Sequence, residues 1–188
     1  MNVYMALVHY PVLNRKGEVI AAAITNLDLH DLARLACTYG LRACYIVTPL
    51  KDQQELARRL VRHWCEGVGG QLVPNRALAL QRLRIRESIE GVKQEIFVEC
   101  GRLPLVWGTS ARIRSECVKP LRARQEAEEK KTPTLILFGT GWGLAPEVLE
   151  TADGVLEPIT GCNGYNHLSV RCAAAILLDR FFQGITLR

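Results

Sequence analysis

The most constraining feature of this sequence is a set of short, almost wholly apolar segments separated by stretches with helical periodicity. The clearest is TLILFGT (134–140), in which apolar side chains follow one another without alternation. A strand that is apolar on both faces must be covered on both faces, which is typical of strands in parallel sheets. Strands that alternate with helices favour the α/β class, with helices on both sides of the sheet.

The other apolar runs predict further strands, and helical spacing predicts the helices between them. Strands are expected at 3–10 (VYMALVHY), 43–49 (ACYIVTP), 95–100 (EIFVEC), 103–109 (LPLVWGT) and 154–159 (GVLEPI). Helices are expected at 29–39, 51–65, 75–87, from Pro146 and at 167–183, and the charged stretch 111–131 is helical or partly a mobile loop. With no internal repeat or low-complexity segment, residues 1–188 are expected to form a single domain.

The composition favours a soluble, cytoplasmic protein. No apolar run approaches the roughly 18–20 residues of a membrane span, and the N-terminus lacks the basic start and the cleavage site of a signal peptide. The seven cysteines show neither a CxxC pair nor the spacing of metal ligands. Free thiols in a reducing compartment are therefore expected, and no metal site.

Arginine clusters indicate an anionic partner. The formal net charge is only +5, but arginines gather at 58–62, 82–86 and 112–124. A single cluster of this kind is more often a solvated helix face. Three clusters in one chain favour RNA as a partner.

The first of two polar loops, FGTGWGLAPEV (138–148), follows the apolar strand and leads into a helix. Its glycines allow positive φ angles and a close approach of ligand to backbone. A dinucleotide fingerprint would need its third glycine where Leu144 stands, although Glu157 lies near the place of a ribose-binding acid. The chain that follows, about 30 residues, is too short for the rest of a dinucleotide domain. A ligand loop and an ordinary strand–helix turn both remain open.

The second loop, GCNGYNHLSVRCAAAILL (161–178), joins polar residues to an apolar helix. Asn166 is expected to cap that helix by accepting from the N–H of Ser169. Asn163 and His167 then have no packing role, which indicates a loop that faces a ligand. A helix that is apolar nearly all round is buried in the core or in a subunit interface. Two such loops at the carboxyl ends of neighbouring parallel strands would form one ligand crevice.

Three segments, taken in order, resemble the motifs of the SPOUT superfamily of RNA methyltransferases. They are LVWGTSARIR (105–114), LILFGTGWGLAPEVL (135–149) and LEPITGCNGYNHLSVRCAAAILLDRF (156–181). The segment 21–41 is similar to the first motif of that superfamily, an asparagine before a helix. The nearest likeness is to a small bacterial family related to the tRNA guanine-N1 methyltransferases.

This resemblance implies a Rossmann-like parallel sheet whose C-terminal segment passes through a loop to form a deep trefoil knot. It implies S-adenosylmethionine as the cofactor, bound in a bent form by the loops of the knot, and tRNA or rRNA as the molecule that is methylated. It also implies a homodimer in which the C-terminal helices pack together. Such a contact would explain why helix 167–183 is apolar nearly all round.

Carried over position by position, the resemblance implies a cofactor site made largely of main chain. Its expected members are Thr109, Phe138, Gly139, Gly141, Gly143, Ile159, Gly161, Asn166, Leu168 and Ser169. Arg112, in GTSAR, is expected to reach RNA or the acceptor. Some SPOUT families carry an arginine six residues after the first-motif asparagine. Counted from Asn26 that position is Leu32, and Arg34 lies two residues further on.

Methyl transfer from a sulfonium needs alignment and exclusion of water, and an acceptor that carries a proton also needs a base. His167 is one candidate for the catalytic base, with a hydrogen-bonding role at the helix start as the alternative. Asp28 is another, with helix capping or a first-turn acid as the alternative, and His30 lies nearby. An acceptor base could stack on Trp142, which is the better candidate, or on Tyr165, whereas Trp107 is expected in the core.

The leading hypothesis is therefore an enzyme, an S-adenosylmethionine-dependent methyltransferase that acts on tRNA or rRNA. One alternative is an RNA-binding SPOUT protein that holds the cofactor without transferring the methyl group. A small NAD-dependent oxidoreductase is the weaker alternative.

Overall fold

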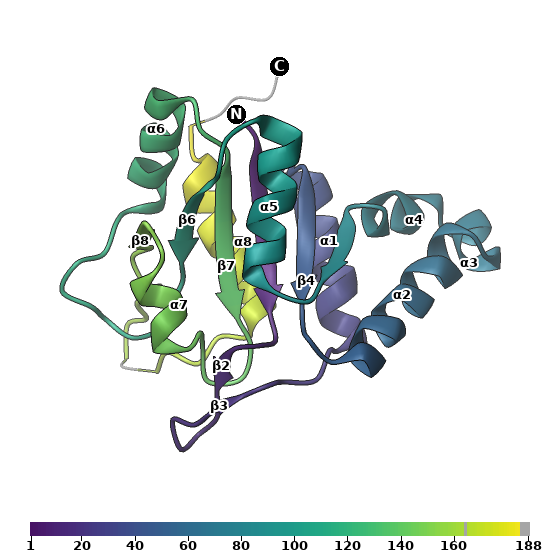
Figure 1. Cartoon of the computed structure of the whole chain (residues 1–188), viewed down its shortest axis with the longest axis horizontal. Helices are drawn as coiled ribbons and strands as arrows, with labels where there is room; N and C mark the ends of the chain where they lie inside the picture. The colour runs from purple at the N-terminus through teal and green to yellow at the C-terminus, as the bar shows by residue number, and fades with distance from the viewer. Residues whose placement is uncertain (164, 185–188) are drawn as a thin grey trace.

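The computed structural model describes residues 1–163 and 165–184, and its centre is a six-stranded parallel sheet with helices on both faces (Figure 1). The strands are β1 (Val3–Val8), β2 (Val12–Leu13), β3 (Val19–Ile20), β4 (Ala43–Val47), β5 (Leu83–Arg86), β6 (Leu105–Gly108), β7 (Thr134–Gly139) and β8 (Gly154–Val155). The helices are α1 (Asn26–Thr38), α2 (Lys51–Cys65), α3 (Val68–Leu72), α4 (Pro74–Leu80), α5 (Ile89–Cys100), α6 (Pro120–Lys130), α7 (Pro146–Glu150) and α8 (Val170–Phe182). The expected α/β class is confirmed.

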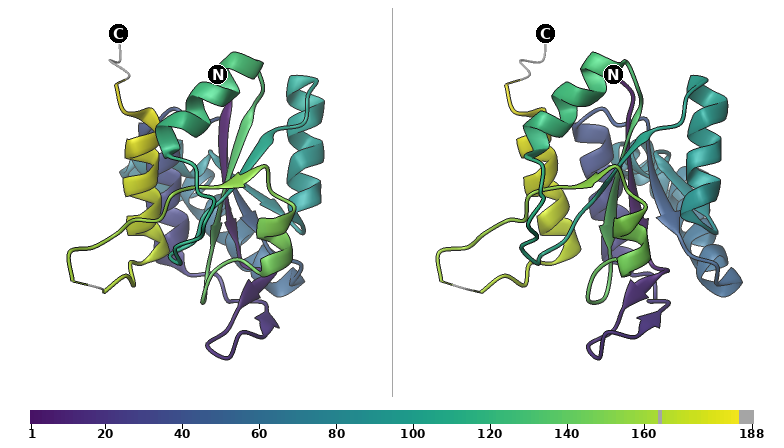
Figure 2. Two further views of the ribbon diagram at one scale, coloured as in Figure 1. Left: turned by 90° about the vertical axis from the view of Figure 1, so that its left-hand side faces the viewer. Right: turned by 60° about the vertical axis from the view of Figure 1, so that its left-hand side comes forward.

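The apolar runs form the middle of the sheet, whose strand order is β5-β4-β1-β7-β6-β8. All six residues of β1 are buried, and β1 pairs in parallel with β7 from Val3 opposite Thr134 to Val8 opposite Gly139. One face of the sheet packs against α1, α2, α4, α6 and α8, and the other against α5 and α7 (Figure 2). Side chains that alternate along each strand therefore enter two separate cores.

The predicted helix 75–87 is wrong in its second half. Helix α4 ends at Leu80, and β5 follows as the edge strand beside β4. In β5, Leu83 and Ile85 alternate with two arginines, and only the apolar side chains pack into the core. This short alternation was too brief to stand out from the helical pattern that precedes it.

The predicted strand 95–100 is wrong as well, because these residues end helix α5. The hydroxyl of Ser88 accepts from the N–H of Gly91 at 3.1 Å and caps the first turn, and Gly101, with φ of +70°, ends the helix. Buried Val92 and Ile96 are four residues apart, whereas Val98 is 82% exposed. A short apolar run does not distinguish a strand from a helix, and the cap residues decide here.

The hairpin of β2 and β3 has no counterpart among the predicted elements. It lies between β1 and α1 and projects from the carboxyl edge of the sheet (Figure 2). Its first strand also pairs outside the hairpin, since Val12 bridges to Leu144 in the glycine loop. The hairpin therefore belongs to the same edge as the loops that carry the expected site residues.

The C-terminal segment returns along the sheet before it enters α8. After β8, the chain pairs with the end of the segment that follows β6: Val118 donates to the carbonyl of Val155 and accepts from the N–H of Glu157, each at 2.8 Å. Helix α8 then packs on α6 and α1, with Ala174, Leu177, Leu178 and Phe181 buried. None of the helices in the described ranges combines the length and apolar character that crossing a bilayer requires.

Candidate functional site at the carboxyl edge of the sheet

Four segments meet at the carboxyl edge of the central strands. The hairpin follows β1, residues 140–145 follow β7, residues 109–119 follow β6, and residues 156–169 follow β8. Because β1, β7, β6 and β8 are parallel neighbours, their carboxyl ends share one edge, which is where ligands bind in open α/β sheets. The ten expected cofactor residues lie on, or at the ends of, the last three of these segments.

The glycine loop, residues 139–145, has three glycines, and they serve two different purposes. A Cβ on Gly139 would lie 2.5 Å from the backbone nitrogen of Leu144, and one on Gly141 would lie 2.8 Å from the carbonyl oxygen of Leu13. These two glycines therefore serve close packing within the protein. Gly143 has φ of +105° and open space around its Cβ position, so its outer side is free to meet a ligand.

Asn166 does not cap the last helix, so this prediction is wrong. Helix α8 begins at Val170, and the hydroxyl of Ser169 accepts from the N–H of Cys172 at 3.3 Å. The side-chain amide of Asn166 instead donates to the carbonyl of Ala111 at 2.8 Å. It therefore joins the segment before α8 to the segment after β6. A serine three residues closer to the helix supplies the same cap, which frees Asn166 for this contact.

Three aromatic side chains, Trp142, Tyr165 and His167, form a cluster that is hereafter called the aromatic cluster. The His167 ring lies 5.3 Å from that of Tyr165 and 6.3 Å from that of Trp142, with edge-on geometry in both pairs. Trp142 is 50% exposed and Tyr165 is 68% exposed. Two segments thus present exposed rings side by side, an arrangement suited to stacking of an unpaired base.

Asp28 lies in the first turn of α1 and is held on both oxygens. One oxygen accepts from the hydroxyl of Thr25 at 2.6 Å, and the other pairs with Arg171 of α8 at 3.3 Å. Thr25 also caps α1 by accepting from the N–H of Asp28. Arg171 reaches Asp31 as well, at 3.3 Å. Asp28 therefore fastens the start of α1 to the start of α8, which is a structural role and leaves its oxygens occupied.

His9 and Arg171 are two further titratable residues, and no sequence motif indicated them. His9 directly follows the buried strand β1 and is fully buried, and neither ring nitrogen makes a hydrogen bond of good geometry within the described ranges. Burial lowers the pKa of His9 to about 4, against a smaller opposing effect of Asp28. A histidine directly after an all-apolar strand, and an arginine within the first turn of an apolar helix, were the available signals.

The remaining expected residues divide into main-chain and side-chain positions. The side chain of Phe138 is buried in the core, so only its main chain can face a ligand, and the half-buried side chain of Ile159 packs against that core from the edge. Thr109 donates its hydroxyl to the carbonyl of Leu137 at 2.8 Å and joins the ends of β6 and β7. Leu168, 46% exposed, lies just before α8.

The first-motif positions on α1 point away from these loops. Leu32 is fully buried in the core, and Arg34 is exposed. The ring of His30 meets that of Trp64 at 5.5 Å, and burial lowers its pKa, as does the charge of Arg76. His30 thus contributes to packing between α1 and α2. Trp107 is 1% exposed, which confirms its expected place in the core.

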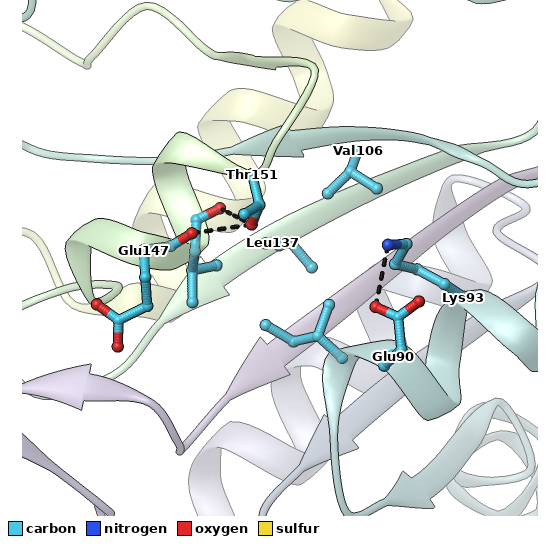
Figure 3. Close-up of a pocket in the computed structure, with 8 residues that line it drawn as sticks. Glu90, Lys93, Val106, Leu137, Glu147 and Thr151 are labelled. Carbon is cyan, nitrogen blue, oxygen red and sulfur yellow. Dashed lines mark hydrogen bonds and ion pairs between the residues drawn. The ribbon is translucent and has the colours of Figure 1, made fainter.

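A hollow of about 240 Å³ lies on the other face of the sheet, between α5 and α7 (Figure 3). It is smaller than ligand pockets of roughly 300–1,000 Å³. Its floor contains Val106 and Leu137, and on its rim Lys93 pairs with Glu90 at 3.0 Å. No residue expected from the sequence lines it. The candidate site residues therefore lie at the carboxyl-edge loops and not in this hollow.

The arginine clusters differ in how their charges are used. In the cluster 82–86, Arg84 pairs with Glu95 and Glu99, and Arg86 pairs with Glu95. In the stretch 112–124, the two helical arginines pair with acids of α6. Arg112 and Arg114 are exposed and form no ion pair in the described part of the chain. In the cluster 58–62, Arg62 pairs with Glu55, whereas Arg58 and Arg59 form no ion pair among the described residues. Part of the unpaired charge therefore lies in the loop that contacts Asn166, which suits a polyanion at this edge.

Comparison with known proteins gives a family match over almost the whole chain. The model of a family described as SAM-dependent RNA methyltransferase matches residues 2–183. A curated protein of Nitratidesulfovibrio vulgaris with the name tRNA (guanine-N(1)-)-methyltransferase is 47% identical over 179 residues, which cover 95% of this chain but only 41% of that protein. The chain thus spans less than half the length of this relative.

Two further similarities also cover almost the whole chain. An uncharacterized protein of Aquifex aeolicus is 40% identical over 181 residues, covering 96% of this chain and 88% of that protein. The crystal structure of TrmJ from Z. mobilis superposes with a TM-score of 0.60 at 16% sequence identity, over 98% of this chain and 70% of that one. At this identity the superposition supports the fold alone.

Proposed function

The chain belongs to the family of SAM-dependent RNA methyltransferases, and we propose that its carboxyl-edge loops bind S-adenosylmethionine and transfer its methyl group to a nucleotide of tRNA or rRNA. The contact of Asn166 with Ala111 carries this proposal, because it holds together two of the segments on which the expected cofactor residues lie. The guanine-N1 name supports tRNA as the substrate. That name describes a protein more than twice as long, so the acceptor atom stays open.

The residues at this edge fit such a cofactor. Gly143 leaves open space on its outer side, and the main chain at Ile159 and Gly161 runs in the segment before α8. Thr109 and Asn166 hold the neighbouring segments in place. The cofactor supplies a methyl group activated by a sulfonium, so the protein needs mainly to bind, orient and exclude water.

We assign the acceptor side of the reaction to the aromatic cluster and Arg112. An unpaired base can stack on Trp142, and His167, in contact with that ring, is placed to accept a proton from the base or ribose. Arg112 contributes positive charge for a phosphate of the same nucleotide strand. The alternative base, Asp28, has both oxygens engaged by Thr25 and Arg171, which favours His167.

We further infer that residues 156–169 pass through the loop formed by residues 109–119, giving the trefoil knot expected from the resemblance. Two hydrogen bonds of Val118 to the segment after β8 and the contact of Asn166 with Ala111 support this path. A homodimer through α8 is proposed because this helix leaves the apolar side chains of Cys172 exposed and of Ile176 half-buried. A cytoplasmic location follows from the proposed substrate.

The proposal is tested by incubating the protein with S-adenosylmethionine labelled in the methyl group and with bulk bacterial tRNA and rRNA. Label is expected in one RNA fraction with the wild-type protein and is expected to fall strongly with His167→Ala. Cofactor binding measured by calorimetry without any label transfer would favour the alternative of a cofactor-holding RNA-binding protein. Absence of cofactor binding would contradict the proposal.

A further inference from the structure

The β2–β3 hairpin, which no motif predicted, is built into the glycine loop by main-chain hydrogen bonds. Leu13 donates to the carbonyl of Gly143 and accepts from the N–H of Trp142, both at 2.9 Å. Val12 bridges to Leu144, and both side chains are buried. The hairpin and the glycine loop are thus joined by main-chain pairing. A movement of one therefore changes the position of the other.

The tip of the hairpin is held in one conformation. The side-chain oxygen of Asn14 accepts from the N–H groups of Lys16 and Glu18, at 2.8 and 3.0 Å. Gly17 takes φ of +83° and donates to the carbonyl of Asn14 at 3.0 Å. A turn fixed in this way loses little conformational freedom when it binds a partner, which favours a recognition role.

The charges at the tip are arranged asymmetrically. The carboxylate of Glu18 accepts from the side-chain amide of Asn14 at 2.7 Å. Arg15 and Lys16 are exposed, and neither forms an ion pair within residues 1–163 and 165–184. The hairpin that carries these two cations projects from the carboxyl edge of the sheet and is hydrogen-bonded to the loop next to the aromatic cluster (Figure 2).

We propose that the β2–β3 hairpin is an RNA-docking arm, in which Arg15 and Lys16 bind phosphates of the substrate RNA. Through Leu13 the arm positions Trp142, and Trp142 belongs both to the glycine loop and to the aromatic cluster. A strand bound at the arm is thereby brought to the rings on which its base stacks. This inference rests on the proposed function and adds the surface by which RNA approaches the site.

The free cations favour RNA over a protein partner, although Val19 and Ile20 on β3 are also partly exposed, at 46% and 36%. A second copy of the chain docking on these two residues would need no phosphate and would show little dependence on salt. RNA held by Arg15 and Lys16 releases counterions, and its affinity must fall as salt rises. Salt dependence and oligomeric state therefore separate the two partners.

The experiment measures binding of fluorescently labelled bulk tRNA and rRNA to the full chain over a range of salt concentrations. The variant Arg15→Ala/Lys16→Ala keeps every main-chain hydrogen bond of the turn, so it is expected to fold. The slope of log affinity against log salt is expected to become shallower by about 1.4, the value for two single-strand phosphate contacts. Cofactor affinity in calorimetry is expected to change less than about twofold, and Arg15→Glu/Lys16→Glu is expected to weaken RNA binding further.

The control is Lys130→Ala/Lys131→Ala, which removes the same formal charge at the end of α6, near the amino edge of the sheet, where Lys130 pairs with Glu126 at 2.6 Å (Figure 1). It is expected to leave the slope close to that of the wild type. A wild-type slope in the hairpin variant would overturn the docking arm while leaving the proposed function intact. So would an altered oligomeric state in sedimentation with unchanged salt dependence. Failure of the wild-type protein to bind any RNA would overturn both.

Discussion

The side-chain amide of Asn166 donates a hydrogen bond of 2.8 Å to the carbonyl oxygen of Ala111, across 55 residues of sequence. This bond joins the segment before α8 to the segment after β6. In the proposed site this bond holds the two cofactor loops together. The aromatic cluster lies beside these loops, so the acceptor nucleotide binds at the same edge of the sheet.

Replacing Asn166 with alanine is expected to weaken cofactor binding. A hydrogen bond of this kind contributes about 0.5–1.5 kcal/mol, so the dissociation constant of S-adenosylmethionine in calorimetry is expected to rise by a factor of roughly 2 to 13. Asn163→Ala is the matched control, since Asn163 lies in the same segment and its side-chain oxygen accepts from the nearby N–H of Tyr165. Equal effects of the two substitutions would show that the contact with Ala111 has no special role.

Trp142→Ala is expected to reduce methyl transfer to RNA at low substrate concentration by on the order of tenfold or more, because one base stack on an aromatic ring contributes about 1–3 kcal/mol. The side chain is half exposed, so the melting temperature is expected to change little. Trp142→Phe keeps a stacking surface and is expected to recover most of the activity. If phenylalanine is no better than alanine, the ring does not stack on the substrate.

The stability of the protein is expected to fall in mild acid because of His9. Its folded pKa of about 4 lies below the ordinary 6.5, so the unfolded chain binds the proton first as pH falls. Its contribution is therefore full above about pH 6.5 and is lost as pH approaches 4, with about 2 kcal/mol lost between pH 7 and pH 5. Urea unfolding at several pH values measures this loss.

The control for this titration is a second histidine. His9→Gln is expected to flatten the pH dependence of the unfolding free energy, whereas His63→Gln, at an exposed position on α2, is expected to keep the wild-type dependence. A pH dependence that survives His9→Gln would assign the titration to another group.

The proposed dimer predicts a specific effect of charge on α8. Cys172→Glu places a carboxylate at an exposed position of the monomer, where it is expected to cost little stability, but in a contact between two α8 helices it would be buried. Sedimentation is expected to show monomers for this variant and dimers for the wild type. The control Gln125→Glu adds the same charge on α6. Dimers that persist in Cys172→Glu would place the subunit contact elsewhere.

The sequence predicted the parallel sheet because β1, β4 and β7 are apolar on both faces, a pattern that few other folds need. It failed at α5, where cap residues outweigh a three-residue apolar run, and at β5, where one edge strand has only two apolar positions. The β2–β3 hairpin could not be predicted, because each of its strands has only two residues and half of their apolar side chains are exposed.

The candidate site was predictable as a set of loops and not as a set of contacts. Ser169 and Asn166 are both able to cap a helix, and only the three-dimensional path shows that Ser169 caps it and Asn166 contacts Ala111. Asp28 was expected near the chemistry, but its partner Arg171 lies 143 residues away in the sequence. Such pairings between distant segments have no local signal in one sequence.

Mass spectrometry of nucleosides tests directly whether the chain methylates RNA at this edge. Total tRNA and rRNA from a strain that lacks the protein are treated with the purified chain and S-adenosylmethionine, then digested to nucleosides. One methylated nucleoside that is absent from the deletion strain is expected to be restored by the wild-type protein and not by His167→Ala. An unchanged nucleoside profile, from a protein that binds the cofactor and RNA, would contradict it.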